Sequence, residues 1–138
     1  MLRGIFALCA GLFAAMIVYT VSAVVAMNLW PPTGVDVKDA AQVASFVASL
    51  PDSARLALML GPVLGAFVGA GVGARLAAPS QQAFVASLLG ALLAANTAND
   101  WLRVGHPRWM LVTGVVLSLL AALLAMLLVR KAWPAPGK

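Results

Sequence analysis

Long apolar runs alternate with short polar segments along this chain, and the alternation predicts its fold. A run of about 20 apolar residues is long enough to cross a hydrocarbon core of about 30 Å as a helix. The predicted spans cover residues of about 4–30, 53–78, 81–103 and 107–131. We therefore expect an all-α, integral membrane four-helix bundle that forms a single domain over residues 1–138.

A shorter helix is predicted between the first two spans. Apolar residues recur there at i, i+3, i+4 and i+7, in Val43, Phe46, Val47 and Leu50. This spacing predicts an amphipathic interfacial helix over about 36–50, with Asp36 as its N-cap and Asp39 in its first turn. It is too short to span, so we expect it to lie on the membrane surface or to fold over the outer end of the bundle.

Prolines predict where the first span ends and where the second bends, and the first apolar run has an alternative interpretation. Pro31-Pro32 ends the first span, and Pro62 is expected to kink the second and to free the carbonyl of Leu58. The first run also has the form of a cleaved signal peptide, with Val21-Ser22-Ala23 as the cleavage site. Apolar character continues past that site to Leu29, which favours a retained span.

Composition supports the membrane class. The chain is 63% hydrophobic and 9% charged, whereas soluble domains are about 45–50% apolar and about 25% charged. The net charge of +5 arises from Lys and Arg at the ends of apolar runs, so it indicates topology and a lipid bilayer as partner, and not nucleic acid. The single cysteine, Cys9, excludes an intramolecular disulfide.

Charge placement predicts an orientation. Four spans would place on one side Arg3, Arg75, Arg130, Lys131 and Lys138. They would place on the other side Lys38, Arg55, Arg103, Arg108 and all four acids. The flanks of the first span favour both termini in the cytoplasm of a bacterium, with the protein in the inner (plasma) membrane. Trp30, Trp101 and Trp109 would then form an outer aromatic belt.

A row of glycines in the second span predicts close helix packing. Gly61, Gly65, Gly69 and Gly73 stand four residues apart, and residues at this spacing share one helical face. Such a GxxxG row, or glycine zipper, lets another helix approach to near backbone contact in a membrane. The small residues of the third span make it the natural partner, and a second copy in a homo-oligomer is the alternative.

The linking segments resemble those of a family of small, uncharacterised bacterial four-span membrane proteins. The matching pieces are Pro31-Pro32-x-Gly34-x-Asp36, Ser49-Leu50-Pro51, the glycine-rich span ending Ala74-Arg75, and His106-Pro107-x-Trp109. Members of that family often carry an acid and a histidine near the end of the first span. The corresponding region here reads Val24-Val-Ala-Met-Asn28, so a site made by those residues would be incomplete. The resemblance implies a fold and no activity.

The sequence lacks the residue patterns that common enzymatic mechanisms require. One histidine cannot form a bis-histidine haem site, and no glycine-rich phosphate loop or nucleophile elbow is present. One histidine and one nearby acid are too few ligands for a metal. We expect a non-enzymatic protein without cofactor or metal.

One set of polar residues is expected at the outer end of the bundle. Its members are Tyr19, Arg55, Asn96, Asn99, Asp100, Arg103 and His106. They form either helix ends in the headgroup region or a polar pocket for a lipid headgroup or small ligand. In the pocket interpretation, Asn96 reaches Tyr19 if the first and third spans adjoin, and Asp100 meets either Arg103 in its own helix or Arg55 of the second span.

Three functions remain open from the sequence. The first is a packing, accessory or oligomeric module of the membrane. The second is a small transporter or channel subunit, although few polar residues lie near the midplane. The third is a membrane protein that acts through the outer pocket, either by binding a lipid or small ligand or as an enzyme at the outer interface.

Overall fold

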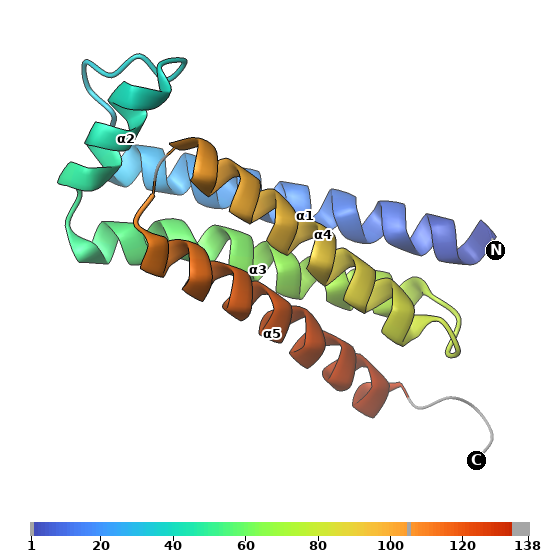
Figure 1. The fold of residues 1–138 in the computed structure, drawn as a ribbon. Helices are drawn as coiled ribbons and strands as arrows, with labels where there is room; N and C mark the ends of the chain where they lie inside the picture. Colours follow the sequence, from blue (N-terminus) through green and yellow to red (C-terminus); the bar gives the residue numbers. More distant parts are fainter. Residues whose placement is uncertain (1, 105, 134–138) are drawn as a thin grey trace.

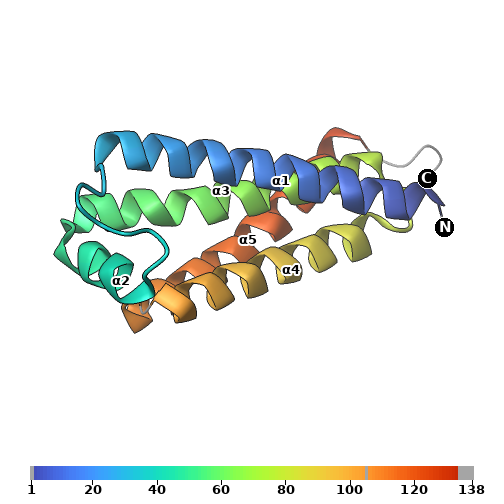
Figure 2. The same ribbon diagram turned by 90° about the horizontal axis from the view of Figure 1, so that it is seen from above.

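The fold was examined in a computed structural model that describes residues 2–104 and 106–133. All regular secondary structure in these ranges is helical (Figure 1). The helices are α1 (Leu2–Leu29), α2 (Ala40–Ser49), α3 (Asp52–Leu76), α4 (Gln82–Val104) and α5 (Arg108–Ala132). The four long helices lie side by side, and α2 lies across one end of them (Figures 1 and 2).

Three of the described helices are apolar and long enough to cross a membrane, which makes this a membrane protein. They are α1 with 28 residues and α3 and α5 with 25 residues each. At about 1.5 Å per residue, each is at least about 37 Å long. Helix α4 has 23 residues, and its last turns carry Asn96, Asn99 and Asp100, which lower its hydropathy.

Helix α3 occupies the centre of the bundle. It packs against α1 on one side and against α4 and α5 on the other, and α4 also packs against α5. Helices α1 and α4 touch far less. They separate toward the end where α2 lies between them (Figure 2).

Small side chains fill the interior and large ones cover the outside. The cluster between α3, α4 and α5 contains Ala70, Ala74, Ala86, Ala122 and Ala125, with Met126 and Val129. Large apolar residues such as Phe6, Phe13 and Leu124 are more than half exposed. This distribution is the one expected when lipid, and not water, surrounds the helices, because packing between membrane helices depends on close approach of small residues.

Asp39, and not Asp36, caps helix α2, which corrects the sequence prediction. The Asp39 carboxylate accepts hydrogen bonds from the backbone N–H groups of Ala41 and Gln42. Asp36 accepts from the Lys38 N–H in the preceding turn. The N-cap therefore lies three residues later than predicted, because the segment after Gly34, whose φ is +76°, is still turning.

The end of the bundle away from α2 is basic and is tied together by arginines. Arg3 at the start of α1 donates to the Leu76 carbonyl at the end of α3, at 2.9 Å. The guanidinium of Arg75 lies 3.9 Å from the ring centroid of Trp133. Cations at these helix ends complement the free carbonyls left by the last turn.

Candidate functional site

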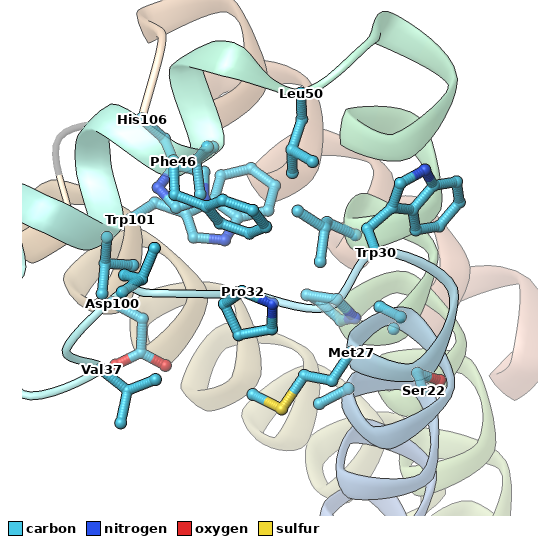
Figure 3. A pocket seen from close by; sticks show the side chains of 18 of the residues that line it. Ser22, Met27, Trp30, Pro32, Val37, Phe46, Leu50, Asp100, Trp101 and His106 are labelled. Atoms are coloured by element: carbon cyan, nitrogen blue, oxygen red, sulfur yellow. The ribbon is translucent and has the colours of Figure 1, made fainter.

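A cavity of about 310 Å³ lies at the α2 end, in the gap between α1 and α4. The second half of α1 forms one wall, the end of α4 forms the opposite wall, and the first half of α3 lies between them. Helix α2 and the segment that precedes it close the remaining side (Figure 3). The volume falls at the lower end of the range of small-molecule sites, which is about 300–1,000 Å³.

The cavity walls are mostly apolar, and several are aromatic. Helix α2 contributes Val43, Phe46 and Val47, and Leu50 follows at its C-cap. These are the apolar residues whose spacing predicted an amphipathic helix, so the helix covers the bundle with that face. The aromatic lining residues are Tyr19, Trp30, Phe46, Trp101 and His106.

A few polar groups stand among these walls. Asp100 lines the cavity and accepts a hydrogen bond from the Asn96 amide one turn earlier on α4, at 3.1 Å. Figure 3 shows Asp100 and Val37 on one side of the cavity and Trp30 on the opposite side. Leu58 and Pro62 line the cavity from α3. Because proline has no N–H, the Leu58 carbonyl lacks its usual intrahelical donor at position 62.

His106 and Trp101 form one wall together. Their rings stack at 5.5 Å between centroids with an interplanar angle of 8°. The His106 Nδ1 atom is buried and has no hydrogen-bond partner among the described residues. Burial lowers the pKa of His106 below its ordinary value, so the imidazole is neutral at neutral pH.

Trp101 is buried, which corrects its predicted place in an aromatic belt. It is 6% exposed and packs with Met59 and Met110. Its ring lies against Gly114 of α5, where a Cβ atom would collide with the indole. A glycine across the interface therefore makes room for the ring inside the bundle. Trp109, in contrast, is 45% exposed.

Three of the seven residues in the predicted pocket line the cavity, namely Tyr19, Asp100 and His106. The other four, Arg55, Asn96, Asn99 and Arg103, are not among its lining residues. The expected contact between Asn96 and Tyr19 does not form in the described structure, where Asn96 is bonded to Asp100. The reason is that α1 and α4 diverge at this depth.

Arg55 serves α2 and not Asp100, which corrects the predicted network. Its guanidinium donates to the carbonyls of Val47 and Ala48 at the end of α2 and to the carboxylate of Asp52. The Arg55–Asp52 ion pair spans 3.2 Å. The Val47 carbonyl also accepts from the Leu50 N–H at the C-cap, and Arg55 adds a donor there and supplies one to Ala48. These bonds satisfy last-turn carbonyls and fix α2 to the start of α3.

The glycine row of α3 faces α1 within the same chain. Gly61, Gly65, Gly69 and Gly73 are all buried. A Cβ atom added at Gly65 would lie 3.2 Å from the Ala15 carbonyl oxygen. One added at Gly69 would lie 2.8 Å from the Gly11 carbonyl oxygen. The first span is thus the main partner, although α4 also reaches the row through Val85, Leu89 and Leu93.

A matching row on α1 was missed by the sequence analysis. Ala7, Gly11 and Ala15 are buried and also stand four residues apart. They meet Gly73, Gly69 and Gly65 in order, as expected for antiparallel helices. The spacing of small residues in the first run was the available signal for this pairing.

The helices and the cavity together define a helical membrane protein with a ligand-sized site at one end. Comparison of the chain with protein-family models, with curated proteins and with solved structures finds no match.

Proposed function

We propose that this protein is a non-enzymatic, four-span integral membrane protein that binds an amphiphilic small molecule or a lipid in the cavity beneath α2. The observation that carries the proposal is the cavity of about 310 Å³ with apolar walls and a few polar groups. Convergence of a few polar groups in an apolar, ligand-sized space is the usual character of small-molecule sites.

The packing of the glycine row favours ligand binding over a role as an oligomeric module. The row is occupied by α1 of the same chain, so it is not left free for a second copy. The cavity, in contrast, is a space that the chain's own side chains leave unfilled.

Two features support α4 as the fourth span and an orientation with both termini in the cytoplasm. Helix α4 packs along α3 and α5, and its polar residues gather in its last turns, where a headgroup region would accommodate them. Among the described residues each end of the bundle carries four lysines or arginines, so the orientation rests on the first span, which has Arg3 before it and Asp36 and Asp39 after it in a bacterial inner membrane. The cavity then opens in the outer leaflet.

Photolabelling in lipid nanodiscs tests the proposal. The probe is a long-chain alcohol with a diazirine near its hydroxyl end, and the labelled residues are located by mass spectrometry of peptides. We expect saturable labelling at cavity residues of α1, α2 and α4, because the walls would hold the alkyl chain. An excess of unlabelled alcohol should compete with the probe at these residues.

Two variants on α1 provide the matched comparison. Ala23→Phe places a ring in the cavity wall and should reduce the saturable labelling at least several-fold. Val25→Phe changes a 52% exposed residue that does not line the cavity and should leave it unchanged. Labelling that follows lipid exposure along all helices, does not saturate and responds equally to both variants would refute ligand binding in the cavity.

A further inference from the structure

The charge of the cavity indicates which chemical class of ligand it binds. Among the described residues that line the cavity, Asp100 is the acid and none is a lysine or an arginine. In the described part of the chain, the Asp100 carboxylate has no lysine or arginine nitrogen within 4.0 Å. Of the two candidates from the sequence, Arg103 lies one turn along α4 but forms no ion pair with Asp100 in the described residues. The other, Arg55, is engaged by Asp52 and by the α2 carbonyls.

The remaining groups around the cavity add no positive charge. Histidine is the other titratable group of this wall that faces the space, and its imidazole is neutral, as described above. Asn96 gives Asp100 one amide hydrogen bond at 3.1 Å, which orients the carboxylate without neutralising it. A carboxylate that is uncompensated beside apolar walls attracts a cation and repels an anion.

The aromatic walls are suited to the same kind of ligand. Tyr19, Trp30, Phe46 and Trp101 approach the space from α1, from the segment after α1, from α2 and from α4. The face of an aromatic ring carries partial negative charge and attracts an ammonium group within about 6 Å, most strongly where water is excluded. In Figure 3, Trp101 lies on the same side of the cavity as Asp100.

We propose that the cavity binds a cationic amphiphile, whose amine or quaternary ammonium head lies beside Asp100 and the aromatic rings and whose chain lies along the apolar residues of α1 and α2. This inference rests on the proposed function, because it assigns a ligand class to the same cavity. It makes Asp100 the residue that determines specificity, while the walls supply affinity for any alkyl chain.

The test uses three photolabels that share one diazirine alkyl chain and differ only in their heads. The heads are trimethylammonium, hydroxyl and sulfonate, and binding is measured as saturable labelling of cavity residues in nanodiscs of neutral lipid. A hydrogen bond or contact to a charged partner contributes enough to change affinity by about 10- to 100-fold. We expect the ammonium probe to bind at least about 10-fold more tightly than the alcohol and the sulfonate to bind more weakly than either.

Two acid variants separate specificity from the fold. Asp100→Asn keeps the shape of the side chain and should remove the preference for the ammonium probe while the alcohol still binds. Asp36→Asn makes the same charge change at the same end, on a residue that does not line the cavity, and should leave the preference intact. Thermal unfolding of both variants in detergent checks that each is folded.

The outcomes distinguish the two proposals. Equal binding of all three probes, or an ammonium preference that survives Asp100→Asn, would overturn the cationic ligand and leave the cavity as a general amphiphile site. Absence of saturable labelling by every probe would overturn the proposed function itself.

Discussion

A single methyl group at Gly69 should destabilise the fold, whereas the same group at Gly71 should not. Both glycines lie in the second half of α3, so Gly69→Ala and Gly71→Ala gain the same helix propensity, up to about 1 kcal/mol. The two positions differ in what the methyl group meets. At Gly69 it would lie 2.8 Å from the Ala15 Cβ and from the Gly11 carbonyl oxygen, and at Gly71 it would lie 3.7 Å from the Ala125 Cβ.

The size of the effect follows from these distances. Ordinary contact begins at 3.4 Å, so α1 and α3 must move apart by about 0.6 Å near Gly69. A gap of about 0.5–1 Å forfeits about a quarter to a half of each dispersion contact along the interface. Overpacking of this kind costs about 1–3 kcal/mol, which exceeds the gain in helix propensity. Gly71→Ala should be neutral or slightly stabilising.

Unfolding of both variants in the same detergent provides the measurement, with circular dichroism or tryptophan fluorescence as the readout. We expect the free energy of unfolding of Gly69→Ala to be lower than that of Gly71→Ala by about 1–3 kcal/mol. Equal unfolding midpoints for the two variants would show that α1 and α3 are not in backbone contact at the centre of the bundle.

Two further predictions concern the α2 end. Arg55→Gln should remove the side-chain donor of the Ala48 carbonyl and speed the hydrogen exchange of α2 amides. Arg108→Gln, which alters an exposed residue at the start of α5, should not. Equal exchange in both variants would contradict the anchoring role of Arg55. His106 is the single histidine, so its imidazole resonance can be followed without ambiguity. Because burial lowers its folded-state pKa, its stabilising contribution should be complete above about pH 6.5, the unfolded value, and be lost as the pH falls through the folded pKa. A resonance that titrates at or above pH 6.5 would contradict this assignment.

The helices were predictable because their signals are local. Apolar runs and the prolines at positions 31, 32, 51 and 107 fix where a chain in lipid can be helical and where it must turn. The N-cap of α2 was missed because Asp36 and Asp39 are equivalent in a sequence. What distinguishes them is the turn at Gly34, whose φ of +76° delays the start of the helix.

The candidate site was less predictable because it depends on distances between helices. The sequence places polar residues at one end but does not say which of them face inward. Arg55 was expected at Asp100, yet the Val47 and Ala48 carbonyls of α2 are nearer along the chain and bind it. Trp101 was expected in an outer aromatic belt, and its burial depends on the room that Gly114 leaves on another helix.

The position of the cavity follows from how side-chain size is distributed along α1. In its first half, small residues at positions 7, 11 and 15 let α1 approach α3 so closely that the Leu89 side chain of α4 also reaches Gly11. In its second half, Tyr19, Met27 and the following Trp30 face the gap toward α4, and side chains of this size cannot support the same approach. The two helices therefore diverge, and a bundle of four straight helices would leave this end open.

Helix α2 covers the opening with its apolar face, but it makes few contacts with the long helices. It is held by Arg55 at one end and capped by Asp39 at the other. Segments with few packed contacts are those that open most readily, so the element that covers the cavity is also the one best able to admit a ligand.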